Sequence, residues 1–235
     1  MRTQEKEDQM ELSHMPIIGP FIRRHDARIA RQAVAHYQAS VVAADGAIAR
    51  VEVPARLLVN CRVVPDRAAM LATLPTGGRW CEVGTADGEF AEQILNICHP
   101  DILHLIDSWA AEHDNRYTNM EDAVKQRLHD HPIETHRGYS TDMLALFSDN
   151  YFDVIYLDAG HGYADTVAEL ELCHQKIKPN GLISGHDYIT GTWRTQYRYG
   201  VIEAVNAFCI RYNWEFLLVT WECHRHISFV LRKVK

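Results

Sequence analysis

The sequence predicts an α/β fold with a doubly wound, mostly parallel sheet of seven strands, of which the C-terminal strand is antiparallel. From residue 79 onward, short apolar segments alternate with segments of helical periodicity, as in repeated β–α units. The first apolar segment, 80–83, runs into a loop with two glycines and then into an amphipathic helix. Polar residues follow several later apolar segments, and ligands bind at such strand ends in an open parallel sheet.

A chain of 235 residues is long enough for one domain with an extension. We assign residues 1–64 to an N-terminal cap or dimerisation extension, with a helix over 21–38 and a small hairpin over 41–53 around Asp45-Gly46. Residues 65–235 form the main domain, which opens with a short helix from Pro65 to Leu74. A homodimer is the expected assembly.

Apolar runs and helical periodicity define the remaining elements of the main domain. The expected strands are 80–83, 102–107, 133–137, 152–158, 182–184, 215–221 and 227–232. The expected helices are 87–98, 118–130, 141–147, 164–177 and 198–212. Pro179-Asn180-Gly181 ends the fourth of these helices, and a tight turn at 223–225 joins the last two strands into an antiparallel hairpin.

Composition and charge narrow the class of protein. A net charge of −7 argues against nucleic acid and against an anionic membrane surface, since both require a basic face. No apolar run approaches the roughly 20 residues that span a membrane, and the start of the chain has no apolar segment typical of a signal peptide. The six cysteines form no Cys-x-x-Cys pair, which is typical of reduced thiols in a cytoplasmic protein.

The glycine spacing after the first strand restricts the ligand of that loop. A dinucleotide fingerprint needs glycine at its first, third and sixth positions, which here hold Gly84, Ala86 and Glu89. A carboxylate at the last position would face a pyrophosphate, so NAD and FAD are disfavoured. The loop also lacks the Gly-Lys-Ser/Thr sequence of a nucleotide-triphosphate site.

The remaining pattern, Glu82-x-Gly84-x-x-x-Gly88, resembles the first motif of class I S-adenosylmethionine (SAM) methyltransferases, which have a Rossmann-like fold. The resemblance implies SAM as cofactor, whose sulfonium and ammonium groups suit acidic neighbours such as Glu82 and Asp158. The residues expected to bind it lie at the ends of the first four strands or just after them. They are Glu82, Gly84, Thr85, Ala86, Asp87, Gly88, Asp107, Ser108, Trp109, Ser140 and Asp158.

Individual roles are expected for the residues that follow the second and third strands. Asp107 is placed to accept both ribose hydroxyls, and Trp109 to cover the adenine. Ser140 either donates to the adenine or caps the next helix, and Asp107 has a capping alternative as well. Asp87, at a helix start, is stabilising there even without a ligand.

The ends of the fourth and fifth strands carry Asp158, His161, His186 and Asp187. We expect a divalent cation at Asp158, His186 and Asp187, with Mg²⁺ as the first candidate, although imidazole also admits Zn²⁺ or Fe²⁺. Such an ion would lower the pKa of an acceptor hydroxyl. His161 would act as general base, and Asp158 is the second expected catalytic residue. The alternatives are a solvated His161, a His186 bonded to a backbone carbonyl, and an Asp158 that contacts the cofactor amino group.

Two longer strings, 157–163 and 185–188, are similar to the branch of these methyltransferases that includes macrocin and other sugar O-methyltransferases, with 200–205 matching downstream. Catechol O-methyltransferase-like enzymes have a related layout, which implies metal ligands at Asp158 and at His186 with Asp187. The chain departs from that layout at two positions. His161 stands where that family has Lys, and His186 where it has Asp.

These observations predict a SAM-dependent O-methyltransferase that acts on a small-molecule acceptor, either a sugar-bearing natural product or a catechol-like ring. The segment 189–199, with Trp193, Arg194, Tyr197, Arg198 and Tyr199, is expected to roof the acceptor, and residues 115–117 to form another wall. The alternatives are a metal-independent N- or O-methyltransferase, a non-catalytic SAM-fold binding protein, and an iron-dependent oxidoreductase.

Overall fold

The computed structural model describes residues 45–110, 119–192, 197–222 and 226–234, together with 27–29, 31–32, 34–36, 39 and 42–43. The chain divides into two units, 1–47 and 48–235. The described residues of 21–38 are helical, in agreement with the predicted helix. The hairpin predicted around Asp45-Gly46 is wrong, because residues 45–47 are helical. Alanines surround this Asp-Gly pair, and their helix propensity outweighs the turn signal.

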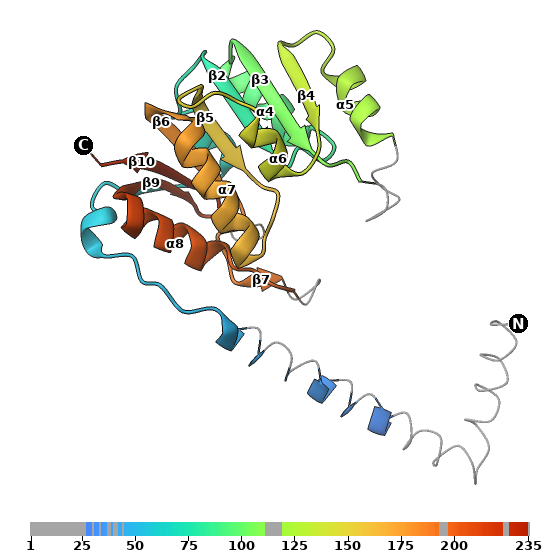
Figure 1. Cartoon of the computed structure of the whole chain (residues 1–235), viewed down its shortest axis with the longest axis vertical. Helices are drawn as coiled ribbons and strands as arrows, with labels where there is room; N and C mark the ends of the chain where they lie inside the picture. Colours follow the sequence, from blue (N-terminus) through green and yellow to red (C-terminus); the bar gives the residue numbers. More distant parts are fainter. Residues whose placement is uncertain are drawn as a thin grey trace, which may run out of the picture. The chain divides into compact units, whose positions relative to one another are not determined.

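The predicted fold class is confirmed by an eight-stranded sheet in the order β1-β9-β10-β6-β5-β2-β3-β4 (Figure 1). Strand β10 is antiparallel to both neighbours, and the other pairs are parallel. The strands are β1 (Arg62–Val64), β2 (Arg79–Val83), β3 (Ile102–Asp107), β4 (Ile133–Arg137), β5 (Phe152–Leu157), β6 (Ile177–Gly185), β9 (Trp214–Thr220) and β10 (Phe229–Lys233). A separate pair is formed by β7 (Gly191–Thr192) and β8 (Tyr197–Arg198).

The sheet has one strand more than the seven predicted. The additional strand, β1, pairs in parallel with β9 although the sequence analysis assigned Arg62–Val64 to the extension. Three residues that are exposed or half-buried carry too little hydrophobic pattern to be recognised. Strand β6 is also longer than predicted and runs through Pro179, with a register irregularity opposite Phe152 and Val154. Its Pro-Asn-Gly sequence marks that irregularity rather than a loop.

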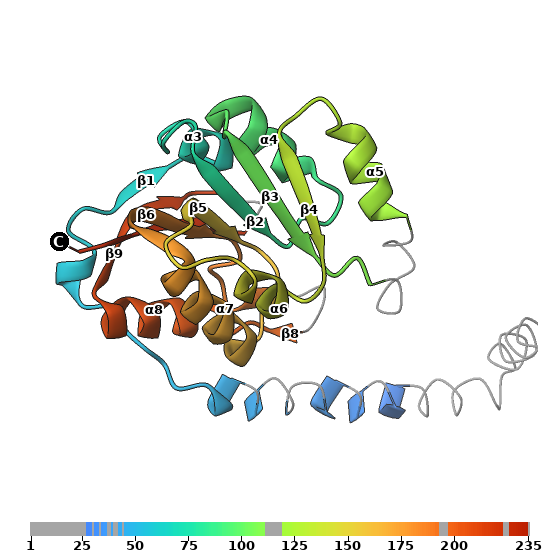
Figure 2. The same ribbon diagram turned by 45° about the horizontal axis from the view of Figure 1, so that its top comes forward.

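Helices cover both faces of the sheet (Figures 1 and 2). The helices are α3 (Arg67–Leu71), α4 (Glu89–Cys98), α5 (Met120–Arg127), α6 (Ser140–Ala145), α7 (Tyr163–Lys176) and α8 (Val201–Tyr212), after a 3₁₀ turn η1 (Ala55–Leu57). Helices α3, α4 and α5 lie on one face, and α6, α7 and α8 on the other. Side chains alternate along β2. Trp80 packs in the core between the sheet and α3, α4 and α5, and Cys81 in the core between the sheet and α6, α7 and α8.

Strands β2 and β5 lie at the topological switch point of the sheet. The chain continues from β2 to β3 on one side and from β5 to β6 on the other, so a crevice opens beyond their carboxyl ends. Two backbone hydrogen bonds close the strand ends, from Asp158 N–H to the Val83 carbonyl at 2.7 Å and from Gly84 N–H to the Ile106 carbonyl at 2.8 Å. Gly84 has φ +93°, and a Cβ there would overlap the carbonyl oxygen of Asp158. Only glycine fits this position.

Two further observations concern the length of the helices and the state of the cysteines. None of the helices that the structure describes is long and apolar enough to cross a bilayer. The five cysteines within the described residues are free thiols, and all but Cys61 are buried.

We expect Gly84→Ala to lower the free energy of unfolding by about 2 kcal/mol or more, since it adds a steric overlap to a left-handed backbone. Gly77→Ala is the matched control. Gly77 also has a positive φ, but the nearest atom to its Cβ position is Asp101 Oδ1 at 3.5 Å. It should lose only about 1 kcal/mol. Urea denaturation of both variants measures the difference, and equal losses would contradict the role of the close strand contact.

Candidate functional site

A cavity of about 680 Å³ lies beyond the carboxyl ends of β2, β3, β4 and β5, where the sequence analysis expected a ligand. Helix α7 closes its far side. The lining residues are Gly84, Ala86, Ile106, Asp107, Ser108, Ala110, Gly138, Tyr139, Ser140, Thr141, Asp158, Ala159, Gly160, His161, Asp165, Ala168 and Glu169. Four of these residues are acidic, and no Lys or Arg is among the described residues that line the cavity. The cavity therefore favours a cationic ligand over one that carries phosphate.

Asp107, at the end of β3, connects the loop after β2 with the loop after β3 on one side of the cavity. Its Oδ2 accepts from the Ala86 N–H and its Oδ1 from the Trp109 N–H, each at 2.8 Å. Each carboxylate oxygen keeps further lone-pair capacity for a ligand in the cavity. Both donors lie in residues with positive φ, 48° for Ala86 and 41° for Trp109, so this carboxylate also holds strained backbone in place.

Trp109 has a different position from the one predicted. Its side chain is 1% exposed and does not line the cavity, and its indole N–H donates to the Ala86 carbonyl at 2.9 Å. The buried ring therefore holds the glycine loop in place through its hydrogen bond to Ala86. Ser108 and Ala110, on either side of Trp109 in the chain, line the cavity. The left-handed backbone of Trp109 turns the ring away from the cavity, which the sequence pattern does not reveal.

The other predicted residues of the first loop divide into lining and supporting positions. Gly84 and Ala86 line the cavity, whereas Glu82, Thr85, Asp87 and Gly88 do not. Asp87 accepts from the Glu89 N–H at 3.1 Å at the start of α4, where a carboxylate is stabilising even without a ligand. Glu82 and Thr85 are buried behind the loop.

Glu82 is a buried carboxyl with an unsatisfied oxygen. Its Oε2 has no hydrogen-bond partner among the described residues. Burial raises the pKa of Glu82 well above its ordinary value, and the nearby charges of Asp158 and Asp107 add to the rise. Such a group is stabilised by an incoming cation.

Ser140 and Glu169 form a polar pair on the α7 side of the cavity. Ser140 Oγ donates to Glu169 Oε1 at 2.5 Å, and the Gly160 N–H donates to the same oxygen at 3.3 Å. Glu169 Oε2 is buried without a partner among the described residues. Glu169 was not among the predicted site residues. Its signal is a carboxylate on the buried face of α7, in helical register with Thr166, Leu170 and Cys173.

Two aspartates and three histidines gather where β5, β6 and β10 meet the rim. His161 Nε2 is in direct contact with Asp187 Oδ2 and lies 3.8 Å from Asp158 Oδ1. His186 Nδ1 lies 3.5 Å from Asp158 Oδ2 and 3.3 Å from Asp187 Oδ1. His226 Nδ1 contacts Asp187 Oδ1. The four residues predicted here are therefore brought together, and Asp158 and His161 also line the cavity.

His226 is the member of this cluster that sequence reasoning missed. Ligand-binding residues were expected at the carboxyl ends of strands, but β10 is antiparallel. Its beginning therefore lies beside the end of β6, with Phe229 paired to Gly185. The residues just before β10 therefore reach the same rim. Asp187, which His226 contacts, has φ +58°, a strained conformation often found at functional sites.

The electrostatics of the cluster follow from burial and close opposite charges. Burial alone would lower the pKa of both His161 and His186, but the hydrogen bonds and charges of Asp158 and Asp187 outweigh it and raise each to about 9. Burial would raise the pKa of Asp187, but the two imidazoles hold it well below its usual range. Without a cation, both imidazoles are therefore protonated near pH 7 and Asp187 is ionised.

Residues on the predicted acceptor side are described only in part. Tyr199 is buried and stacks on His161, with ring centroids 4.6 Å apart. Arg198, expected to face an acceptor, forms an ion pair with Glu203 at 2.6 Å, and both side chains are buried. Trp193, Arg194 and residues 115–117 lie outside the described residues, as does the turn at 223–225.

Comparison with known proteins identifies the family of this part of the chain. A family described as "Methyltransferase domain" matches residues 81–188, from β2 to just past the end of β6. These residues include the glycine loop, the cavity and all of the cluster except His226. No curated protein sequence matches the chain.

Solved structures share the fold at low identity. A SAM-dependent methyltransferase from Aquifex aeolicus aligns with a TM-score of 0.55 and 15% identity over 77% of this chain and 94% of that one. The pyocyanin biosynthetic protein PhzM aligns at 0.53 and 13% over 71% and 54%. The O-methyltransferase TomG from Streptomyces achromogenes, involved in tomaymycin synthesis and solved with SAM, aligns at 0.51 and 17% over 67% and 73%.

This chain spans about half the length of PhzM, and identities of 13–17% show the fold alone. The matched range contains the carboxyl ends of β2, β3, β4 and β5, which border the cavity. The protein therefore has the Rossmann-like α/β methyltransferase fold, with a methyltransferase domain recognised over residues 81–188.

Proposed function

We propose that the protein is a SAM-dependent O-methyltransferase that acts on a hydroxyl of a small metabolite with the assistance of a divalent cation. The observation that carries this proposal is the cluster of Asp158, His161, His186, Asp187 and His226, which adjoins the cavity through Asp158 and His161. A methyl-donor cavity and a group of metal-ligating and proton-accepting side chains thus share one wall.

The cavity suits SAM in shape and charge. Gly84 and Ala86 line the cavity, so the backbone of the glycine loop can approach a ligand there without an intervening long side chain. Asp107 would accept the ribose hydroxyls with its remaining lone pairs, and Glu169 Oε2 offers an acceptor for the exocyclic amino group of adenine. The carboxylate of Asp158, which lines the cavity, complements the sulfonium and ammonium charges.

The donor set of the cluster fits a divalent cation. Asp158, His161 and Asp187 offer ligand atoms within 4.8 Å of one another, and so do His186, Asp187 and His226. The buried Nε2 of His186 has no partner among the described residues. Two carboxylates with three imidazoles favour Mn²⁺, Fe²⁺ or Zn²⁺ over Mg²⁺, which prefers oxygen ligands.

The cluster's own residues account for the proton that methyl transfer releases. The acceptor oxygen forms its new bond to the methyl carbon, the carbon–sulfur bond breaks, and the electron pair stays on sulfur as a thioether. The acceptor proton passes to His161, whose neutral form is the base. A cation bound beside Asp158 and Asp187 would offset the two carboxylate charges that otherwise hold this imidazole protonated near pH 7, and it would lower the pKa of the acceptor hydroxyl. Tyr199 holds the His161 ring by stacking.

A metal-independent methyltransferase is the second candidate. The contact between His161 and Asp187 is by itself a His–Asp pair, in which the carboxylate orients the imidazole without any ion. The acceptor in either case is a small molecule with a sugar or catechol-like hydroxyl. The segment from Ile189 to Tyr199 follows the cluster directly in the chain and is the proposed acceptor wall.

SAM and its demethylated product should bind the full-length chain, and Asp107→Ala should weaken binding about 10- to 100-fold, since the variant loses charge-assisted hydrogen bonds. Asp101→Ala is the control, because Asp101 is exposed at the opposite end of the same strand. Isothermal titration calorimetry measures all three proteins. Absence of heat with either ligand in the unaltered protein would refute the cofactor assignment.

Methyl transfer to a catechol or sugar acceptor should fall at least about 100-fold with EDTA and recover with Mn²⁺, Zn²⁺ or Mg²⁺. Asp187→Asn should abolish the recovery, because it removes the carboxylate that three imidazoles share. Transfer of a radiolabelled methyl group measures both effects. Full activity in EDTA would exclude the cation and support the metal-independent candidate instead.

Glu169→Gln should flatten the pH dependence of stability. Burial raises the pKa of Glu169 from its ordinary 4.5 to about 7, so the folded protein binds this proton more tightly than the unfolded chain. The carboxyl therefore costs stability progressively as pH rises from about 4.5 to 7, by up to about 3 kcal/mol. Denaturant unfolding at pH 5 and pH 8 should show the variant gaining relative to the parent at pH 8. An equal difference at both pH values would contradict the raised pKa.

A further inference from the structure

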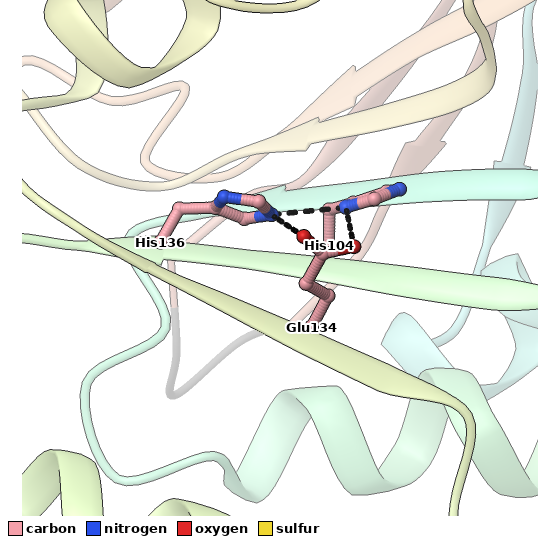
Figure 3. A group of neighbouring side chains, drawn as sticks. All are labelled: His104, Glu134 and His136. Atoms are coloured by element: carbon pink, nitrogen blue, oxygen red, sulfur yellow. Dashed lines mark hydrogen bonds and ion pairs between the residues drawn. The ribbon is translucent and has the colours of Figure 1, made fainter.

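We propose a second metal site, formed by His104, Glu134 and His136, that binds one divalent transition-metal ion, with Zn²⁺ as the best-matched ion. The three side chains point toward one another on the face of the sheet that α6 and α7 cover (Figure 3). They come from β3 and β4 and do not line the cavity of the proposed methyl-donor site. Neither the family match nor the proposed function accounts for them.

Strand register brings the three residues together. His104 pairs directly with Glu134 across the parallel β3–β4 ladder, and His136 lies two residues beyond Glu134. Side chains alternate along a strand, so all three project from the same face. Both strands are held by backbone hydrogen bonds, so the positions of the three side chains are set by the sheet rather than by a loop.

The distances match those of a metal site with two histidines and one carboxylate. His104 Nδ1 lies 3.0 Å from His136 Nε2 and 3.6 Å from Glu134 Oε2, and His136 Nε2 lies 3.9 Å from Glu134 Oε1. Ligand atoms about 2.0–2.1 Å from a tetrahedral Zn²⁺ are about 3.3 Å apart, within this range. The ion would take the place of the hydrogen shared by the two rings.

A second layer of contacts orients His104. Its Nε2 is hydrogen-bonded to the Tyr151 hydroxyl at 3.2 Å, so a proton on Nε2 would leave the lone pair of Nδ1 directed at the site. Metal-bound imidazoles usually donate their other N–H in this way. Phe147 packs edge-on against both rings, with centroids 5.0 Å from His104 and 5.1 Å from His136. The aromatic packing restricts the rotation of both ligands.

Charge state and exposure also suit a metal. Burial lowers the pKa of His104 to about 4 and that of His136 below its ordinary value, so both rings are neutral near pH 7, the form that binds metal. The exposed fraction rises from 3% for the His104 side chain to 18% for His136 and 56% for Glu134. An ion can therefore enter from the Glu134 side, where water would complete its coordination.

The ion would link β4, the edge strand, to β3. Strand β4 leads directly into Gly138, Tyr139 and Ser140, which line the methyl-donor cavity. Because the unfolded chain cannot hold the three ligands together, bound Zn²⁺ would raise the stability of the sheet edge that carries this cavity wall.

Zinc titration of the full-length chain tests this site. The background is Asp158→Ala with Asp187→Ala, which removes both carboxylates of the proposed catalytic cluster. In this background we expect one Zn²⁺ bound per chain by calorimetry and a Zn²⁺-dependent rise in Tm. Adding His136→Ala should abolish both. Tyr151→Phe, which retains the ring, should weaken binding about 10- to 100-fold through loss of the hydrogen bond to His104.

His129→Ala is the matched control, because it removes an exposed imidazole from the same part of the chain without touching the site. It should bind Zn²⁺ as the background does. The same His136→Ala change in the otherwise unaltered chain should lower the number of bound ions by one, which keeps the test valid if the double variant is unstable. Unchanged stoichiometry after His136→Ala, in either background, would overturn the proposal. The outcome does not depend on methyl-transfer activity, so it is independent of the proposed function.

Discussion

The architecture of the site depends on how closely the ends of β2 and β5 approach one another. The Asp158 N–H donates to the Val83 carbonyl, and the left-handed Gly84 leaves no room for a Cβ beside the Asp158 carbonyl. This contact brings the glycine loop and the first residue after β5 to one rim. The cavity, the acidic wall and the histidine cluster all follow from that geometry, because each is formed by residues within a few positions of those strand ends.

The rim concentrates groups that are costly to bury without partners. Asp187 is contacted by His161 and His226 and lies near His186, and its left-handed backbone adds strain. Glu82 and Glu169 each keep a buried oxygen without a partner among the described residues. Such arrangements lower stability, and strained, imperfectly paired polar groups of this kind are concentrated at functional sites. Supporting contacts, such as that between Trp109 and Ala86, then hold the loops in place.

The sheet presents two clusters of metal-ligating side chains with opposite electrostatic character. At the rim, His161 and His186 are protonated beside two carboxylates, with each pKa raised to about 9. At the β3–β4 edge, His104 and His136 are neutral, because burial lowers the pKa of each and a single carboxylate lies nearby. A cation at the rim would have to displace protons, whereas an ion at the edge would meet imidazoles that are already deprotonated.

Local pattern was enough to establish the α/β class, the order of the elements and the gathering of Asp158, His161, His186 and Asp187. Hydrophobic residues repeat every 2 positions in strands and about every 3.6 in helices, a pattern that depends only on neighbouring residues. The rule that ligands bind at the carboxyl ends of strands then locates the site from the order of the elements. Strand β1, His226 and Glu169 were not found this way. The first depends on pairing with β9, the second on the reversed direction of β10, and the third on which face of α7 is buried against the cavity. The inward-turned Trp109 and the alignment of His104 with Glu134 likewise follow from backbone conformation and strand register. These are relations between segments distant in sequence, and three-dimensional packing is what sets them.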